Sequence, residues 1–432
     1  MAEALMRKEG NDPVNPTTAS RPKRPQPAQP VFESVPLTPG MFTSKRALKL
    51  VLELMAIPGP SGEEQAVVDY IVAKLKQVGV PGSTISTDQA HRRTPINGKV
   101  GNLICKLPGT LRGPRRLLVA HMDTVPLAVG SRPIQAGHLI GSANKQSGLG
   151  ADDRSGVAVL LNTVMEIFER KLPYPPLTLL WPVQEEIGLH GARCANIGKL
   201  GNPRLAFNWD GGAAEKMTIG ATGAYRLDIT VDGLASHAGG APERGVSAVT
   251  ISGLAIADLQ QHGWLGEVIK DGVRGTTNIG VIEGGSATNV VTSRVMLRAE
   301  CRSHDAKFRQ RLVKEFEQAF ERAAQSVRNV DGVTGKVAIA SRLDYESFVL
   351  AENDPSIQAA DAAIRAIGLT PERSISNGGL DANWLTARGI PTVTLGCGQM
   401  NPHTTSERLD LEVYDQACKI ALRLATGNEN AS

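Results

Sequence analysis

The segment Leu117-Leu118-Val119-Ala120-His121-Met122-Asp123 joins a short apolar run to a histidine and an aspartate. The run over 117–120 predicts a buried strand that ends at His121, and α/β folds place their chemistry in loops at the carboxyl ends of strands. Residues i and i+2 of an extended segment point the same way, so the Asp123 carboxylate can reach the His121 ring and fix its tautomer. His121 is therefore a candidate metal ligand, with a general base or a surface histidine as alternatives.

Acidic residues follow further apolar runs along the chain. Glu185 and Glu186 close the run over 177–183, Asp210-Gly211-Gly212 follows the run over 205–209, and Asp152-Asp153 opens a helix that continues over 157–168. Adjacent strand residues face opposite ways, so one of the two glutamates can bind metal while the other faces a water. Such oxygen ligands, together with imidazoles, suit a divalent ion such as zinc, cobalt or manganese.

Each acidic motif also has an ordinary explanation. One aspartate of the pair at 152–153 can cap its helix, although two exceed what a cap needs. The glutamates at 185–186 can be solvated residues at the start of a loop, and an Asp-Gly pair marks many ordinary turns. A histidine in a glycine-rich loop, as at His403, is usually structural or solvated. Only the ordered set of motifs points to a two-metal site.

The order of predicted elements indicates two domains. Apolar strands that alternate with helices favour an α/β fold with a mostly parallel sheet and helices on both faces. Between them, strands and helices follow the order of a ferredoxin-like α+β unit, with elements at 225–231, 246–259, 277–282, 290–302, 305–327 and 336–345. We therefore predict a first domain over 41–218 that resumes over 348–432, interrupted by an inserted domain over 219–347.

The N-terminal residues have a different composition. Residues 1–40 are rich in proline and poor in large apolar residues, which predicts a disordered or polyproline-like tail. A helix over 44–57 is expected to begin the ordered chain. Ser61-x-x-Glu64 has the spacing of a capping box and is expected to start a second helix.

Composition excludes several other classes. The 432 residues are 41% hydrophobic and 21% charged, and the net charge is +4 without a Lys/Arg block, so nucleic acid is not expected as a partner. No run approaches the ~20 apolar residues of a membrane span, and the first residues lack the apolar core of a signal peptide. Five dispersed cysteines without a C-x-x-C pair fit reduced thiols in a cytoplasmic protein.

The ordered motifs resemble those of the co-catalytic zinc metallopeptidases that include peptidase T (tripeptide aminopeptidase), carboxypeptidase G, aminoacylase and succinyl-diaminopimelate desuccinylase. The resemblance covers about residues 43–425 and is closest to the peptidase T-like branch, through HMDTVP, GADDRSG, EEIGLHGA, the DGG after a strand, SHAGGAPERGVSA and GGLDAN. It implies a zinc exopeptidase-like fold in which the inserted domain serves as a lid and dimerisation domain.

The resemblance also implies a role for each matching residue. His121 and Asp210 would bind one ion, Glu186 and His403 the other, and Asp152 would bridge them, which leaves Asp153 structural. Three catalytic roles follow as well: Glu185 as general base, Asp123 as the residue that orients His121, and the lid residue His237 as an oxyanion donor. The family has a cis peptide after the bridging aspartate, so the bond between Asp152 and Asp153 is expected to be cis.

Substrate contacts are implied for the lid residues Asn289 and Arg294. One position departs from the family. Tripeptide aminopeptidases carry an arginine before the Gly-Gly pair, whereas Asn377 precedes Gly378-Gly379 here, and Leu380 occupies the position of a usual threonine. Asn377 is kept as a candidate substrate contact, but a neutral amide cannot make the forked ion pair of arginine with a carboxylate. Strict tripeptide specificity is therefore not predicted.

The sequence thus predicts a cytoplasmic two-metal exopeptidase for short peptides, with two divalent ions per subunit, zinc first and cobalt or manganese as alternatives. A second reading is an amidohydrolase of N-acyl amino acids with the same machinery. A third is a metal-binding scaffold without catalysis, which the retained Glu185 argues against. A homodimer joined through the lid is a candidate assembly, and neither nucleic acid nor membrane is expected as a partner.

Overall fold

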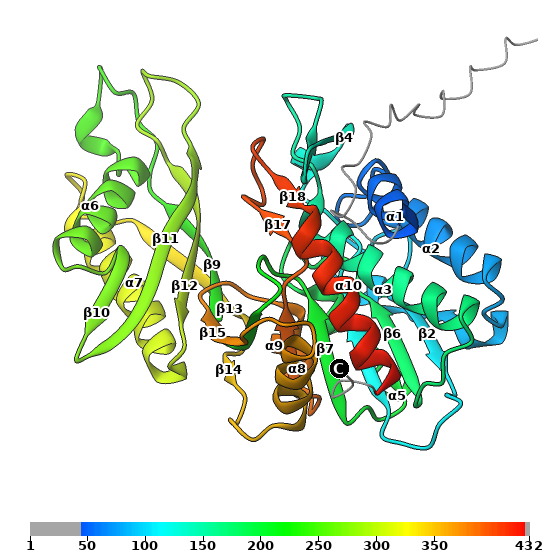
Figure 1. Ribbon diagram of the computed structural model, residues 1–432. Coiled ribbons are helices and arrows are strands. Elements are labelled where there is room, and N and C mark those ends of the chain that lie inside the picture. Colours follow the sequence, from blue (N-terminus) through cyan, green and yellow to red (C-terminus); the bar gives the residue numbers. More distant parts are fainter. Residues whose placement is uncertain (1–44, 428–432) are drawn as a thin grey trace, which may run out of the picture. The chain divides into compact units, whose positions relative to one another are not determined.

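The central sheet organises the larger part of the protein in the computed structural model, which describes residues 45–427. The predicted tail over 1–40 lies outside these residues. Nine strands form the sheet in the order β1-β2-β6-β3-β7-β16-β8-β14, and β15 also pairs with β8 (Figure 1). The strands are β1 (Ile85–Thr87), β2 (Leu103–Leu107), β3 (Arg116–Val119), β6 (Leu177–Trp181), β7 (Leu205–Trp209), β8 (Lys216–Ala221), β14 (Phe348–Val349), β15 (Glu372–Ser376) and β16 (Thr392–Leu395).

The centre of this sheet is parallel. Strands β6, β3, β7 and β16 run in the same direction, while β2 pairs antiparallel with β6 and β8 antiparallel with β16. Parallel neighbours end at the same edge, so the residues after β3, β6, β7 and β16 are brought together there. The predicted α/β class with a mostly parallel sheet is confirmed, and the antiparallel pairs lie toward its edges.

Helices cover both faces of the sheet. Alternate residues of β3 enter different cores: Leu118 belongs to the larger cluster, and Leu117 and Val119 belong to the smaller one. The larger core is formed with α1 (Lys45–Met55), α2 (Gln65–Gln77), α3 (Ala151–Glu169), α8 (Pro355–Arg365) and α10 (Leu411–Thr426); the smaller with α4 (His190–Arg193), α5 (Ile197–Leu200) and α9 (Asp381–Ala387). Among the described helices, none has the length and apolar composition needed to span a membrane.

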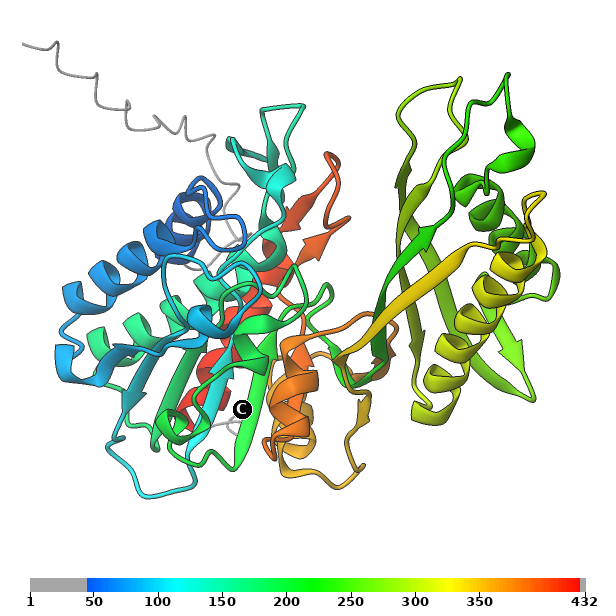
Figure 2. The ribbon, with the colours of Figure 1, turned by 180° about the vertical axis from the view of Figure 1, so that it is seen from behind.

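The inserted segment has a sheet of its own (Figure 2). Its buried apolar residues form a separate core. Its five antiparallel strands have the order β10-β11-β12-β9-β13, and its elements are β9 (Gly223–Asp232), α6 (Ala248–Gln261), β10 (Gly266–Lys270), β11 (Val273–Gly284), β12 (Arg294–Ser303), α7 (Ala306–Ser326) and β13 (Lys336–Tyr345). The predicted ferredoxin-like order is present. Strand β10 is an addition that the sequence analysis missed. Asp271 and Gly272 both have positive φ, the turn chemistry of a tight hairpin, and join β10 to β11.

A small third sheet holds the loop that carries His403. Its strands have the order β17-β18-β5-β4, with bounds β4 (Pro133–Ala136), β5 (Leu139–Ser142), β17 (Gln399–Met400) and β18 (Arg408–Asp410). Because β18 pairs with β5, the hairpin between β17 and β18 is fixed to a segment more than two hundred residues earlier. Short 3-10 turns complete the described elements: η1 (Gly82–Thr84), η2 (Ala90–Arg93), η3 (Pro126–Ala128) and η4 (Pro242–Arg244).

The capping box expected at Ser61-x-x-Glu64 is wrong. Helix α2 begins at Gln65, and its N-cap residue Glu64 makes no capping side-chain hydrogen bond. Ser61 Oγ donates instead to Asp123 at 2.6 Å, and Glu64 Oε1 accepts from the backbone N–H groups of Gly62 at 2.8 Å and Gln184 at 3.1 Å. The tertiary fold offers these side chains buried partners that a local motif cannot reveal.

Candidate metal centre

His121 lies directly beyond β3, and only 1% of the residue is exposed. Its Nδ1 lies 3.1 Å from the backbone oxygen of Asp123 and 3.5 Å from the carboxylate of the same residue. That carboxylate also accepts hydrogen bonds from the backbone N–H groups of Glu185 and Glu186, at 2.9 and 3.1 Å. Burial opposes ionisation of Asp123, but its hydrogen bond to His121 and its other donors hold its pKa below the ordinary value. Asp123 thus contacts both His121 and the backbone of the glutamate pair.

Asp152 lies between two imidazoles. Its Oδ1 is 3.2 Å from Nε2 of His121, and its Oδ2 is 3.2 Å from Nε2 of His403. The peptide bond between Asp152 and Asp153 is cis, as expected. Burial would raise the pKa of Asp152, but the hydrogen bonds to the two histidines hold that pKa well below its usual value. One carboxylate therefore faces two nitrogen donors from distant parts of the chain.

Asp153 is turned toward the backbone. It accepts hydrogen bonds from the N–H groups of His121 and Gly156, both at 3.1 Å. Burial is the main cause that raises its pKa well above the ordinary value. One of its oxygens also comes close to ligand atoms of His121 and Asp210. The backbone hydrogen bonds favour the structural role that the resemblance implies.

The two glutamates point to different histidines. Glu186 Oε2 lies 2.9 Å from Nε2 of His403, whereas Glu185 Oε2 lies 3.9 Å from Nε2 of His121. The second oxygen of Glu186 is buried and has no hydrogen-bond partner among the described residues. The two adjacent glutamates thus have different neighbours, and the predicted division of their roles stays a prediction.

Asp210 completes the group at the end of β7. Its Oδ1 lies 3.9 Å from Nε2 of His121 and accepts a hydrogen bond from Gln399 Nε2 at 3.3 Å. Gln399 begins β17, so the hairpin that carries His403 also positions Asp210. Gln399 was not among the predicted site residues, because nothing in its local sequence pattern distinguishes it.

The donor set fits a divalent cation. Ligand atoms of His121, Asp152 and Glu186 lie within 4.8 Å of one another, and so do those of His121, Asp153 and Asp210. Burial and the charge of neighbouring acids raise the pKa values of Glu185 and Asp210 well above normal. Buried like charges are costly unless compensated, and the unpartnered oxygen of Glu186 needs a partner. Bound metal ions would balance the negative charge of these buried acids and give the Glu186 oxygen a partner.

Acidic neighbours also raise the pKa values of the two histidines. Burial would lower the pKa of His121, but the charge of Glu185 and the hydrogen bonds to Asp123 and Asp152 raise it well above 6.5. Hydrogen bonds to Asp152 and Glu186 raise the pKa of His403 to about 10, although about half of its side chain is exposed. The acidic groups around both imidazoles thus favour positive charge at these rings. A bound cation in place of the protons would be favoured in the same way.

Glu407 supports the loop that enters α3. Its Oε2 accepts from the N–H groups of Leu149 and Gly150, both at 2.7 Å, and its Oε1 accepts from Asp152 N at 3.1 Å. The sequence showed Glu407 four residues after His403 but gave it no role. Its contacts couple the His403 loop to the backbone of Asp152.

The residues that are predicted to belong to a lid stand apart from this buried set. His237 is exposed, and its Nδ1 accepts hydrogen bonds from Gly239 N at 3.1 Å and Gly240 N at 2.9 Å. Asn289 is exposed, and Arg294 forms an ion pair of 3.2 Å with Asp232. Within residues 45–427, no recorded hydrogen bond or ion pair joins His237, Asn289 or Arg294 to the candidate ligands.

Asn377, at the end of β15, contacts the inserted segment. Its Oδ1 lies 3.4 Å from Arg274 Nη1 and 3.3 Å from His304 Nε2, and its backbone oxygen lies 3.5 Å from Arg302 Nη1. The amide is therefore occupied by basic groups of the inserted domain. Its predicted contact with substrate stays a prediction.

A parallel-centred α/β sheet with a buried cluster of acids and imidazoles defines the protein as a metallohydrolase-like chain. The model of "Peptidase family M20/M25/M40" matches residues 117–427. A curated relative, "Uncharacterized protein YqjE" of Bacillus subtilis (strain 168), is 30% identical over 86% of this chain and 95% of its own length. The chain belongs to this peptidase family.

Two solved structures are similar over nearly the whole chain. A tripeptidase from Staphylococcus aureus subsp. aureus Mu50 has a TM-score of 0.79 and 30% identity, covering 90% of this chain and 100% of that one. Aminopeptidase PepT from Bacillus cereus ATCC 10987 has a TM-score of 0.75 and 30% identity, covering 91% and 100%. The family resemblance and the predicted class, a metal-dependent hydrolase of peptide bonds, are confirmed.

Proposed function

We propose that this protein is a two-metal exopeptidase that hydrolyses short peptides in the cytoplasm. The observation that carries the proposal is the placement of Asp152, one oxygen toward His121 and the other toward His403, both at 3.2 Å. A carboxylate in that position can bridge two ions. His121 and Asp210 would hold one ion and Glu186 and His403 the other. The similarity to a tripeptidase and to PepT supports peptides as the substrate class.

Two divalent ions would supply polarisation of the scissile carbonyl and a lowered pKa for the attacking water. Zinc suits the mixed imidazole and carboxylate donors best, with cobalt or manganese as alternatives. Glu185 is the proposed general base, because its carboxylate lies at the cluster and is not hydrogen-bonded to a candidate metal-binding histidine. Its Oε2 lies 3.9 Å from Nε2 of His121. A carboxylate at that place can take the proton from the attacking water and return it to the leaving amine.

The proposed roles of the remaining residues follow from their contacts. Asp123 holds both His121 and the backbone of the glutamate pair in place. In neutral His237 the accepting Nδ1 leaves the proton on Nε2, which makes that nitrogen a donor for the oxyanion of the tetrahedral intermediate. Asn289, Arg294 and Asn377 are proposed substrate contacts. The domain boundaries 41–218, 219–347 and 348–432 and a homodimer through the lid are proposed with them.

Metal removal tests the function directly. Exhaustive chelation should abolish hydrolysis of dipeptides and tripeptides, and zinc, cobalt or manganese should restore it. The same assay with N-acyl amino acids examines the alternative amidohydrolase, which would use the same residues. Full activity of protein shown to be metal-free would contradict the two-metal proposal. Stoichiometric metal binding without turnover on any of these substrates would instead favour an inactive scaffold.

A further inference from the structure

The loop between α1 and α2 reaches the candidate metal centre. Its residue Ser61 is half-buried, and its Oγ donates a hydrogen bond of 2.6 Å to Oδ2 of Asp123. The proposed mechanism gives this serine no part. A hydroxyl donates more strongly to an ionised carboxylate than to a neutral acceptor, and 2.6 Å is a usual length for such a bond. The contact is therefore strong enough to influence how the Asp123 side chain is held.

Four groups share the carboxylate of Asp123. Oδ1 accepts from the backbone N–H of Glu185 at 2.9 Å and lies 3.5 Å from Nδ1 of His121. Oδ2 accepts from the backbone N–H of Glu186 at 3.1 Å and from the hydroxyl of Ser61. A carboxylate has about four lone-pair sites, so each oxygen has two contacts. Because the side chain is fully buried, loss of the hydroxyl would leave one acceptor site without a partner.

The loop that carries Ser61 is itself held in place. The backbone oxygen of Gly59 accepts from the N–H of Thr124 at 3.1 Å and from Nη2 of the buried Arg154 at 3.3 Å. A Cβ atom at position 59 would lie 2.6 Å from that guanidinium nitrogen, so glycine permits the close approach. The hydroxyl therefore has a fixed position from which to donate.

The same loop also holds the backbone that precedes the glutamate pair. Gln184 has a φ of 55°, in the left-handed region that residues other than glycine rarely adopt. Glu64 Oε1 accepts from the N–H of Gln184 at 3.1 Å. Ser61 acts on the next two N–H groups through the oxygens of Asp123. One loop thus supports three consecutive residues that end in the two glutamates.

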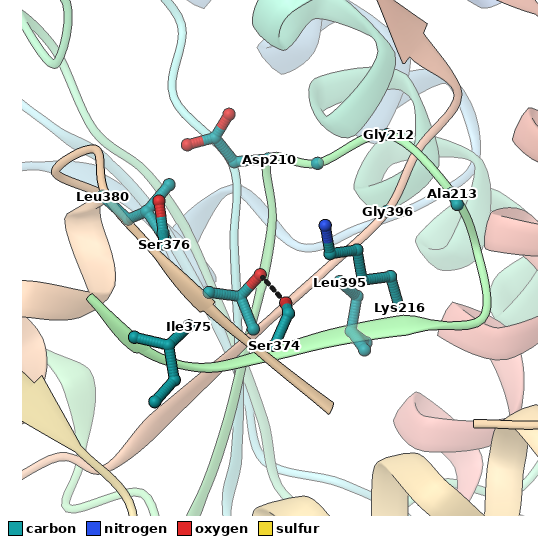
Figure 3. A pocket seen from close by; sticks show the side chains of 12 residues that line it. Asp210, Gly212, Ala213, Lys216, Ser374, Ile375, Ser376, Leu380, Leu395 and Gly396 are labelled. Carbon is teal, nitrogen blue, oxygen red and sulfur yellow. Dashed lines mark hydrogen bonds between the residues drawn. The ribbon is translucent and has the colours of Figure 1, made fainter. Parts of the chain in front are cut away.

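The position of Ser61 favours an effect on the metal ligands over a contact with substrate. A hollow opens beside the candidate ligand Asp210, with walls from β8, from β15 and from the end of β16 (Figure 3). Neither Ser61 nor Asp123 lines this hollow. A serine hydroxyl has one proton, and that proton is already donated to a buried carboxylate.

We propose that Ser61 is a positioning residue of the metal centre. Its hydroxyl fixes the rotation of the Asp123 carboxylate, and Asp123 in turn holds the ring of His121 and the backbone of the two glutamates. The inference rests on the proposed two-metal function and deepens it. Without the hydroxyl, the carboxylate can turn, and the ligands and the general base occupy a wider range of positions. Metal affinity and turnover then both fall.

Zinc affinity tests this role without turnover. Zinc titrated into metal-free Ser61→Ala protein should bind roughly tenfold more weakly, the scale of lost partners that orient metal ligands. Ser61→Thr keeps a hydroxyl and should recover most of the loss. The control Ser86→Ala removes an exposed hydroxyl from β1 and should bind zinc as the wild type does. An unchanged zinc dissociation constant in Ser61→Ala would overturn the proposal.

Kinetics distinguish positioning from substrate contact. At saturating zinc, Ser61→Ala should lower kcat for a hydrolysed peptide roughly tenfold, because a small displacement of reacting groups is costly. It should change KM less than about threefold, since no contact with substrate is lost. A raised KM with an unchanged kcat would show that the hydroxyl binds substrate, and would refute the positioning role.

A double-mutant cycle shows whether Ser61 acts through Asp123. In the Asp123→Asn background, Ser61→Ala should change zinc affinity less than about twofold, because the carboxylate that it served is gone. Full additivity of the two losses would contradict the proposal. Thermal unfolding of the metal-free proteins should give similar melting temperatures for Ser61→Ala and Ser86→Ala. A lower melting temperature of Ser61→Ala with normal zinc affinity would assign it a purely structural role.

Zinc binding and peptide hydrolysis can fail separately. If the wild type binds two zinc ions but hydrolyses no peptide, the proposed function fails, and the zinc affinity of Ser61→Ala still decides the positioning role. If the wild type hydrolyses peptides while Ser61→Ala keeps normal zinc affinity and kcat, the positioning role fails and the proposed function stands.

Discussion

The segments around the central sheet and the inserted segment hold their candidate site residues in opposite ways. In the larger domain, His121 and Asp123 are buried and hydrogen-bonded to other members of the cluster. In the inserted domain, His237 and Asn289 are exposed, and the recorded side-chain contacts of His237 are local. The difference teaches that the fold arranges the metal cluster before substrate binds. In the described contacts of one chain, by contrast, the residues of the inserted segment are not held against that cluster.

Loss of the proposed general base, Glu185, should have the largest effect on activity. Glu185→Gln should lose roughly a hundredfold or more in turnover because the amide cannot accept a proton. Its metal content, measured by elemental analysis, should stay near normal. Glu186→Gln should instead weaken retention of one ion, since Glu186 Oε2 lies 2.9 Å from His403. Normal metal in the second variant and depleted metal in the first would mean that the two roles are exchanged.

Loss of the lid histidine comes next. His237→Ala should lower turnover by roughly a hundredfold, the cost of one oxyanion donor. Metal content and thermal stability should not change, because His237 is exposed and lies outside the cluster. Wild-type turnover by this variant would remove His237 from the mechanism.

A mixing experiment tests whether the lid acts across a dimer. Mixed His237→Ala and Glu185→Gln chains should regain part of the activity if a partner's lid completes each site, because one site of a heterodimer then holds both intact groups. No recovery in confirmed heterodimers would mean that each chain uses its own lid.

Removal of a supporting carboxylate should have a smaller effect. Glu407→Gln places an amide N–H₂ against backbone N–H groups that now donate to a carboxylate, so the loop before Asp152 loses at least one hydrogen bond. Metal affinity should fall about tenfold, as for partners that orient metal ligands elsewhere. Glu412→Gln, an exposed change in the first turn of α10, is the matched control. An unchanged metal dissociation constant would separate this loop from the metal centre.

The smallest effect should appear in stability rather than activity. Burial, then the charge of Asp123, raises the pKa of Glu64 from 4.5 to about 7. The folded chain therefore keeps a proton that the unfolded chain releases, and the free energy of unfolding falls as pH rises from 4.5 to about 7. Glu64→Gln should remove this loss and stabilise the protein by on the order of 1–3 kcal/mol at pH 8, with little change at pH 4.

Denaturant unfolding at several pH values measures the effect. Glu63→Gln is the control, because its ion pair with Lys99 is at the surface. Equal changes at pH 4 and pH 8 for Glu64→Gln would show that lost packing or hydrogen bonding, not charge, decides the result. That outcome would also mean that buried charge near the cluster does not distinguish it from the exposed residues of the inserted segment.

Sequence periodicity and order were sufficient for the architecture. Buried strands such as β3, β6 and β7 were predicted because short apolar runs end at polar residues, and the inserted unit because its strands and helices have a ferredoxin-like order. The extra strand β10 and the small sheet of β4, β5, β17 and β18 were missed, since such short edge elements depend on pairing with distant partners. Local patterns carry little information about such pairing.

For the candidate site, the sequence alone determined which residue types follow the strands, and the motif order identified the family. Only the tertiary structure decided that Asp152 lies between His121 and His403, that Ser61 and Glu64 serve buried partners instead of a helix cap, and that Glu407 holds the loop before α3. Side-chain identity is local, but hydrogen bonds and buried charges depend on residues brought together from distant parts of the chain.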